Sequence, residues 1–162
     1  MTFIVDGTNG LTFPDTSVQG SSSKVLQVVQ ATTSTTVTIG TTTFTATGLT
    51  ASITPKFATS KILVLINNPM RRSGTSPNGY GADIRIYRNG SSIFAPMTNI
   101  GYTDTLTNFP LSWLVPIMYL DSPSTTSSTT YAMYFACVLA TNQFVSCVDG
   151  NTATIQLLEI AA

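Results

Sequence analysis

The chain has 162 residues, of which 43% are hydrophobic and 9% charged, and its seven basic and seven acidic side chains cancel. A typical soluble domain carries about 25% charged residues, and a neutral chain cannot bind nucleic acid through counterion release. The longest apolar run, residues 62–66, is far shorter than the ~20 residues that span a bilayer. We therefore expect no nucleic-acid partner and no membrane insertion.

The N-terminal residues, MTFIVDGTNG, lack the positive charge and apolar stretch of an export signal, so we expect assembly in a cytoplasm. Few charges combined with many apolar residues indicate that apolar surface is hidden against other subunits. A net charge near zero would otherwise favour uncontrolled association. The composition therefore predicts an obligate oligomer.

Runs with period-two alternation recur every ten to fifteen residues, and no window shows helical spacing of apolar residues. Thr, which favours strands, is abundant throughout. The chain is therefore predicted to be all-β. The expected strands are residues 24–31, 35–40, 42–49, 52–55, 61–68, 81–89, 91–96, 111–121, 130–140, 144–149 and 153–161.

The clearest turn is Asn89-Gly90, which lies between two alternating runs. Both central residues of a type I′ turn need a positive φ, and Asn-Gly is the pair that best supplies it. We therefore expect a tight hairpin of residues 81–89 and 91–96, with Ile84 and Ile86 on one face.

Two of the expected strands, KILVLI at 61–66 and YAMYFACVLA at 131–140, are apolar on both faces. A sheet with one wet face does not need this pattern. One face would pack in a sandwich and the other would meet a neighbouring subunit. We therefore predict an antiparallel β-sandwich, similar to a jelly roll. Pro116 predicts an edge strand or a bulge, because proline cannot donate to the ladder.

Three longer connections are expected at residues 67–81, 97–110 and 121–130, and long loops on a rigid sandwich commonly bind partners. Arg and Tyr are favoured at binding hot spots. This makes four residues of the first two connections candidate receptor contacts. They are Arg71, Arg72, Tyr80 and Tyr102. The alternative is that the arginines keep the loop soluble or pair with an acid of the next subunit.

The chain contains no histidine, which removes Ser-His-Asp and Cys-His pairs and every His-dependent metal site. Its acidic residues stand singly in turns, and no nucleotide-binding or CxxC motif is present. We therefore predict no catalytic, cofactor-binding or metal-binding residues and no cofactor. For Cys137 and Cys147 the sequence favours buried thiols over a cross-strand disulfide.

The stretch GTNGLTFPDTSVQ, residues 7–19, resembles a short segment of the form TGLTFPDGTVQ that recurs in bacteriophage tail-fibre and related virion proteins. The glycine that usually follows the Asp is absent here, since Thr16 follows Asp15. The body is similar to β-sandwich modules of phage structural proteins over residues 7–66 and at the closing strand TIQLLEIAA. The middle of the chain matches no such module.

This resemblance implies a homotrimer in the virion, with an extended attachment arm at residues 1–23 and a β-sandwich at 24–162. Arm residues expected to attach to other virion proteins are Gly10, Leu11, Phe13, Pro14, Asp15, Val18 and Gln19. The function expected is a short tail-fibre or tail-tip component that recognises a host glycan or protein. The alternative is a capsid decoration protein. It is favoured because we expect no coiled-coil or β-helical shaft, which would give a fibre its length. A glycan-cleaving enzyme is disfavoured by the lack of an acid pair.

Overall fold

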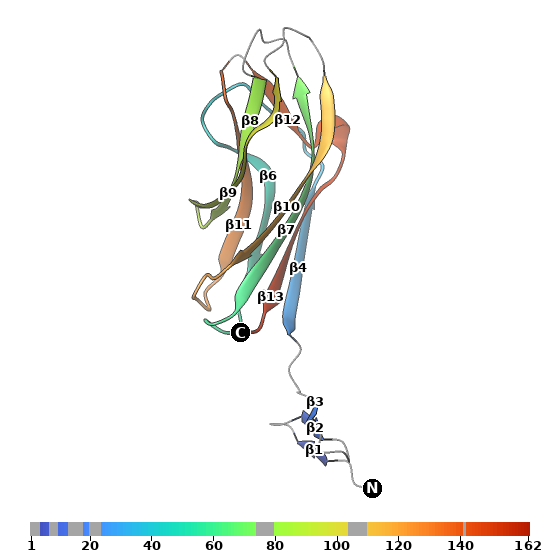
Figure 1. Ribbon diagram of the computed structural model, residues 1–162, viewed down its shortest axis with the longest axis vertical. Helices are drawn as coiled ribbons and strands as arrows, with labels where there is room; N and C mark the ends of the chain where they lie inside the picture. Colours follow the sequence, from blue (N-terminus) through green and yellow to red (C-terminus); the bar gives the residue numbers. More distant parts are fainter. Residues whose placement is uncertain are drawn as a thin grey trace.

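The structure is a computed structural model, and we describe residues 4–6, 10–12, 18–19, 24–73, 80–103, 110–140 and 142–162. Side chains are described only from Lys24 onward, and those of Ser73, Tyr80 and Thr103 are left aside. The described chain is almost entirely antiparallel β-structure arranged as a two-layered sandwich (Figure 1), which confirms the predicted fold class.

The N-terminal segment contributes a small sheet of its own, in the order β1-β2-β3. Its strands are β1 (Ile4–Asp6), β2 (Gly10–Thr12) and β3 (Val18–Gln19). Leu11 pairs with Gln19 and Thr12 with Val18 in an antiparallel register. The described strands of this segment pair with one another, and its role as an extended attachment arm stays a prediction.

The first layer of the sandwich, which we call the β7 sheet, is built around its longest strand. Its members are β4 (Val25–Thr33), β5 (Val37–Ile39), β7 (Lys61–Ser73), β10 (Leu111–Asp121), β12 (Gln143–Ser146) and β13 (Ala153–Ile160). Strand β10 pairs with β7 on one side, whereas β13 and then β12 pair with it on the other. Strands β4 and β5 complete the sheet next to β13 and β12.

The second layer, the β11 sheet, has the order β6-β11-β8-β9. It consists of β6 (Thr45–Ile53), β8 (Tyr80–Arg88), β9 (Ser91–Thr103) and β11 (Thr129–Cys137). One short 3₁₀ helix, η1 (Val148–Gly150), connects β12 to β13. Among the described residues, β9 and β10 are the free edges on the same side of the two layers.

The core lies between the two sheets and is made of alternate residues from each strand. Ile62, Val64 and Ile66 of β7 face Ile84 and Ile86 of β8, and each of the five is at most 1% exposed. Large aromatic side chains fill the centre. They are Tyr131, Phe135 and Phe144. Cys137 and Cys147 are buried free thiols, the alternative that the sequence favoured.

Two local predictions are confirmed by the backbone. Asn89 and Gly90 have φ values of 48° and 82° and join paired residues Arg88 and Ser91, as a type I′ hairpin requires. Pro116 lies in β10, whose pairing partner among the described residues is β7 alone, so it occupies an edge strand.

Several element boundaries differ from the predicted ones. Residues 42–49 and 52–55 were expected as two strands, yet β6 runs through both as one strand with a bulge opposite Met133. Strand β7 continues past Asn67–Asn68–Pro69, a sequence typical of a turn. Asn68 and Pro69 lie where β7 passes from β13 to β12, so the missing proline donor leaves no ladder bond unmade on that side.

A buried carboxylate ties the loop after β6 to the β7 sheet. Glu159 is fully buried, and its carboxylate accepts hydrogen bonds from Gln27 Nε2 at 2.6 Å and from the backbone N–H of Lys56 at 2.7 Å. Burial alone would raise the pKa of Glu159, but its polar surroundings outweigh burial and lower the pKa, with hydrogen bonds from Gln27 and from the backbone N–H groups of Lys56 and Phe57 among the causes. The carboxylate is therefore held ionised by neutral donors.

Candidate interaction surfaces

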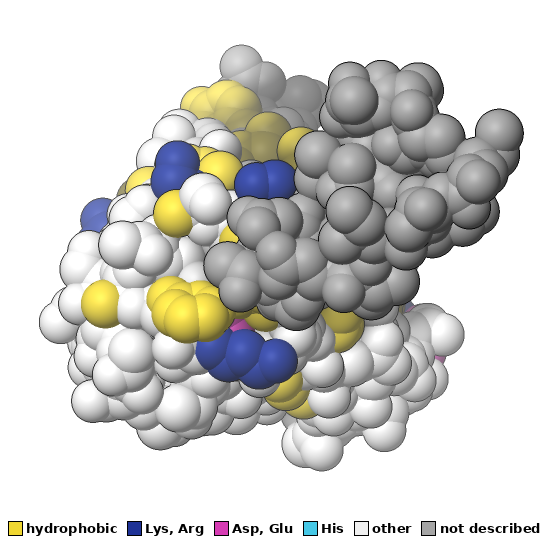
Figure 2. All heavy atoms as spheres, turned by 90° about the horizontal axis from the view of Figure 1, so that it is seen from below, with side chains coloured by type: hydrophobic (Ala, Val, Ile, Leu, Met, Phe, Trp, Pro, Cys, Tyr) yellow, Lys and Arg dark blue, Asp and Glu magenta, His cyan; other side chains and the backbone are white. Residues whose placement is uncertain are grey.

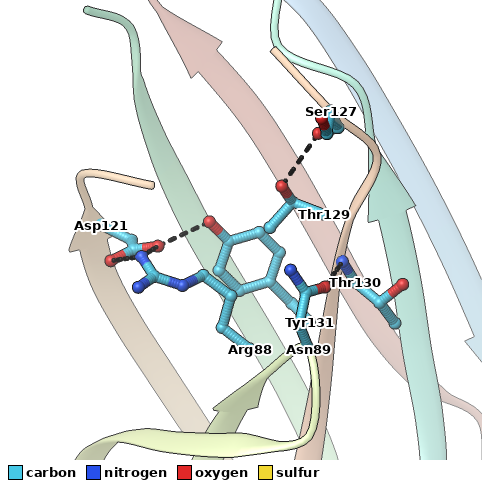
Figure 3. Close-up of polar contacts among 7 residues, drawn as sticks. All are labelled: Arg88, Asn89, Asp121, Ser127, Thr129, Thr130 and Tyr131. Atoms are coloured by element: carbon cyan, nitrogen blue, oxygen red, sulfur yellow. Dashed lines mark hydrogen bonds and ion pairs between the residues drawn. The ribbon is translucent and has the colours of Figure 1, made fainter. Parts of the chain in front are cut away.

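A polar cluster of three side chains joins the two layers near the hairpin turn (Figure 3). Asp121, at the end of β10, accepts from Arg88 Nη1 of β8 at 2.8 and 3.0 Å. Its carboxylate also accepts from the hydroxyl of Tyr131 of β11 at 2.6 Å. Because β10 belongs to one sheet and β8 and β11 to the other, this cluster, the inter-sheet clamp, fastens the layers together.

The electrostatics of the clamp favour its charged form. The hydrogen bond to Asp121 raises the pKa of Arg88, since a guanidinium beside a carboxylate holds its proton more tightly. Burial, reinforced by the hydrogen bond to Asp121, raises the pKa of Tyr131 far above its ordinary value. The tyrosine therefore stays a neutral donor, and the clamp is a structural unit that joins the two sheets.

The structure places the two candidate arginines in strand β7, so their prediction as loop residues is wrong. Arg71 forms an ion pair with Asp149 of the same chain at 2.9 Å, whereas the alternative expected an acid of the next subunit. Arg72 is only 5% exposed. The error arose because Asn67–Asn68–Pro69 was taken as the start of a loop, whereas the strand continues to Ser73.

The two candidate tyrosines also belong to strands. Tyr80 begins β8, and its side chain lies outside the described residues. Tyr102 lies in β9 and is 54% exposed. The connections expected at 67–81 and 97–110 shorten to residues 74–79 and 104–109, which lie outside the described part of the chain. A receptor role for these four residues remains a prediction.

Some of the arm residues expected to attach to the virion lie in described strands, and others lie outside the described residues. Gly10 and Leu11 lie in β2, and Val18 and Gln19 lie in β3, which pairs with it. Phe13, Pro14 and Asp15 fall outside the described residues. Their attachment role, and the division of the chain after residue 23, stay predictions.

The outer surface of the β7 sheet carries a continuous apolar area, which we call the apolar face. Leu120 of β10 pairs with Leu63 of β7, which pairs with Leu158 of β13, which pairs with Val28 of β4. The same surface of β10 also presents Leu114, Pro116 and Met118, and Met118 is 72% exposed. The prediction from KILVLI that both faces of this strand are apolar is confirmed.

Along the part of β7 between Lys61 and Arg71, the described outer side chains of this sheet carry no charge. The apolar area continues around the free edge of β10 into a groove of about 480 Å³. The groove is lined by Met97, Ile100, Gly101, Leu111, Trp113, Leu114, Val115 and Pro116. Strands that are apolar on both faces could be predicted from the sequence. The groove could not, because it depends on which strands lie at the edges of the sheets.

The lower end of the molecule is also poor in charge. Figure 2 shows uncharged and hydrophobic side chains over most of the described surface at this end, with Lys and Arg in a few separate places. In the described ranges, no group of three or more Cys, Asp or Glu side chains is placed to hold a metal ion. None of the helices in the part of the chain that the structure describes is long and apolar enough to cross a membrane.

No protein-family model matches the chain, and no curated protein matches its sequence. Solved structures of infectious bursal disease virus resemble it at low sequence identity. Virus-derived T=1 particles give 15% identity and a TM-score of 0.46 over 98% of this chain and 44% of theirs. The VP2 subviral particle is 12% identical, with a TM-score of 0.43 over 90% of this chain and 40% of the viral chain. The Gx strain is 13% identical, with a TM-score of 0.40 over 85% of this chain and 37% of the viral chain.

The chain therefore spans less than half the length of those viral chains. Similarity at this level concerns the fold alone.

Proposed function

We propose that the protein is a structural component of a virus particle that assembles with further copies of itself, and that it has no enzymatic role. The observation that carries this proposal is the uncharged apolar face of the β7 sheet. A contiguous exposed apolar patch on a sheet surface is typical of a protein–protein contact. One face of β7 is covered by the β11 sheet, and the other requires a partner.

The size of the apolar face fits the centre of a subunit interface. From ordinary strand spacings, the apolar row across four strands is roughly 19 Å wide, and the apolar outer positions of β10 extend it by roughly 23 Å along that strand. Uncharged polar side chains, among them Asn67, Gln156 and Gln30, occupy outer positions of the other strands beside this row. The apolar part is therefore well below the ~800 Å² that each partner buries in a standard interface. The face supplies the apolar centre of such an interface, and the groove beside β10 and the polar rim extend it.

A second copy of this chain suits the apolar face better than a charged partner. The face offers no charge for an acidic or basic surface to match, whereas an uncharged apolar surface of a second copy matches it. In a trimer this is a different surface of the neighbouring copy, because contacts around a threefold axis join unlike patches. Pro116 interrupts the free edge of β10, so addition of a strand there would lack one backbone donor. The contact is therefore between faces.

Within this class we propose a bacteriophage tail-fibre or tail-tip component. The support is the segment GTNGLTFPDTSVQ, whose likeness to tail-fibre segments implies attachment through residues 1–23 and a homotrimeric body. In that arrangement the apolar face meets neighbouring subunits, and the protein binds a host-surface glycan or protein. Localisation in the virion follows.

A capsid decoration protein is the second candidate. Among the described residues from 24 onward, every long element belongs to the sandwich, and no coiled coil or repeated β-helix extends it. A compact body of this kind suits a subunit that clamps a shell, with the apolar face serving only assembly.

Three measurements test these proposals. Sedimentation of the full chain at micromolar concentration should give a trimer, and a monomer would contradict self-association. Electron microscopy of virions with an antibody against the protein should label the tail, and labelling of the head would select the decoration role. Purified protein should also block adsorption of the phage to host cells if it is the tail component.

A further inference from the structure

A hollow of about 240 Å³ opens on the outer surface of the β11 sheet, on the side away from the apolar face. Two tyrosines form part of its lining. Tyr87 of β8 and Tyr134 of β11 stack with their ring centroids 4.0 Å apart and their planes at 27°. The remaining lining is small or hydroxylated, apart from one leucine. It consists of Ala46, Gly48, Leu49, Thr50, Gly90, Thr130 and Ala132.

The hollow is produced by a bulge in β6. Ala132 pairs with Thr50 while Tyr134 pairs with Ala46, so three residues of β6 lie opposite Met133 alone. Gly48, at the centre of the bulge, has a φ of +82°, which glycine adopts without strain. A Cβ atom on Gly48 or on Gly90 would have no neighbour within 4 Å. These two glycines border open space.

The rim of the hollow is held in place by hydrogen bonds (Figure 3). Asn89 exchanges two with Thr130: its backbone N–H donates to the Thr130 carbonyl at 2.9 Å, and its Oδ1 accepts from the Thr130 N–H at 2.8 Å. The hydroxyls of Thr130 and Ser52 lie 2.7 Å apart. The turn and β11 are thus fixed before any ligand arrives, which lowers the entropy lost on binding.

The chemistry of the lining selects an uncharged ligand. No Lys, Arg, Asp or Glu is part of the lining, so a charged group inside the hollow would contact no counter-charge in its walls. Arg85 is the cross-strand neighbour of Tyr134, and its guanidinium lies over the Phe44 ring at 4.1 Å. The lining is mainly apolar, with hydroxyls from Thr50, Thr130 and the two tyrosines. Neither tyrosine hydroxyl is hydrogen-bonded within the described residues. A ligand with an apolar face and a hydroxylated edge would pack against the apolar lining and hydrogen-bond to the two tyrosine hydroxyls.

We propose that this hollow binds one neutral pyranose ring, whose C–H face packs on the stacked tyrosines while its hydroxyls meet the tyrosine and threonine hydroxyls. Its volume lies below the ~300–1,000 Å³ of sites for drug-sized ligands, which suits a single ring. The ring is either a free sugar or the terminal residue of a glycan chain. This site lies on the sheet opposite the apolar face and does not depend on the proposed assembly.

Saturation-transfer NMR on the full chain tests the site. The probes are the methyl pyranosides of glucose, galactose and mannose, together with N-acetylglucosamine, each at millimolar concentration, and glucuronate serves as the charged comparison. We expect transfer from the protein to the C–H protons of at least one neutral probe and weaker transfer to glucuronate. Absence of transfer to all four neutral probes, or equal transfer to glucuronate, would overturn the proposal.

Variants place the binding in the hollow. Tyr134→Ala should weaken it ~10-fold or more by removing a stacking face, whereas Tyr134→Phe keeps the ring and should weaken it less than ~3-fold. Ala132→Val narrows the hollow without touching the aromatic pair and should also weaken binding. Phe57→Ala, which removes an exposed aromatic ring that does not line the hollow, is the matched control and should leave binding unchanged. Equal binding by Tyr134→Ala and the unaltered protein would place the sugar elsewhere and contradict the proposal.

If Tyr134→Ala fails to fold, Ala132→Val and Tyr134→Phe decide the outcome in its place. A glycan array then separates the two sources of the ring. Retention on immobilised glycans with neutral terminal sugars identifies a glycan end as the ligand. Binding of the methyl pyranosides alone identifies a free sugar.

Discussion

The outer surfaces of the two sheets differ, although both sheets bury the same kind of residue on their inner sides. On the β7 sheet, Leu120, Leu63, Leu158 and Val28 form an apolar row across four strands. On the β11 sheet, the outward positions of β6 are small or hydroxylated, namely Ala46, Gly48, Thr50 and Ser52. Both sheets have the same period-two alternation and the same kinds of strand-forming residues. We therefore attribute the difference to the environment of each outer surface, which is either solvent or a partner.

This contrast assigns separate tasks to the two sheets. An apolar outer surface is tolerated only where it is covered, whereas a surface of hydroxyls and aromatic rings can remain in water. Under the proposed function, the β7 sheet would serve assembly and the β11 sheet would face outward. The following experiments test whether the two surfaces are as independent as this division requires.

The largest loss of stability should follow from opening the inter-sheet clamp, since it holds the two surfaces in one body. Asp121→Ala would leave the buried hydroxyl of Tyr131 and the guanidinium of Arg88 without their acceptor, lowering the free energy of unfolding by about 3 kcal/mol. Urea unfolding measures this. Asp121→Asn, which can still accept from Tyr131, should lose less. A loss below about 1 kcal/mol for Asp121→Ala would show that the clamp contributes little.

The next effect concerns association alone. Met118→Glu would place a carboxylate in the centre of the apolar face, where burial without a partner should raise the dissociation constant ~100-fold. Sedimentation measures the subunit equilibrium, and the fold should be unchanged because Met118 is 72% exposed. Ala46→Glu is the matched variant on the β11 sheet and should associate normally. If the two variants behave alike, the division of tasks between the sheets is wrong.

A smaller, pH-dependent effect is expected at Glu159. Its pKa is lowered in the folded protein, so its stabilising contribution is present above the ordinary carboxyl pKa of about 4.3 and is lost as pH falls through the folded value. Glu159→Gln should lower stability at neutral pH by about 1–2 kcal/mol. On acidification, the free energy of unfolding of the Glu159→Gln variant should change less than that of the unaltered protein. Parallel curves of unfolding free energy against pH would contradict this assignment.

The smallest effect belongs to the hairpin turn that borders the hollow. Gly90→Ala forces a side chain into a φ of +82°, and we expect a loss of about 1 kcal/mol. Gly90→Asn should lose less, since asparagine adopts positive φ more readily. Thermal unfolding of the two variants measures the difference. An alanine variant as stable as the asparagine one would argue against a type I′ turn.

Much of the fold could be predicted because its signals are local. Alternation located the strands, Asn89-Gly90 defined the hairpin, and Pro116 indicated an edge. Each of these depends on residues next to one another in sequence. The same reasoning placed Arg71 and Arg72 in a loop, because nothing local reveals that Pro69 lies where β7 exchanges one partner strand for another.

The sites depend on distant pairings and were therefore hidden. The clamp joins Arg88 to Asp121, 33 residues apart, and the hollow depends on a bulge set by the pairing of β6 with β11. The Thr and Ala residues that line the hollow indicate only that their segments are strands. The apolar face was foreseen as a property of single strands, while its extent became visible once β10, β7, β13 and β4 were aligned.

The order of pairing along β7 also bears on how the protein forms in the cell. Strand β4 (Val25–Thr33) pairs with β13 (Ala153–Ile160), and β7 pairs with β10, β12 and β13, which all follow it in the chain. Such non-local pairings fold slowly. During synthesis the early strands must wait, with their apolar residues uncovered, until the ribosome has released residue 160. A holding chaperone during translation would therefore raise the yield of this protein.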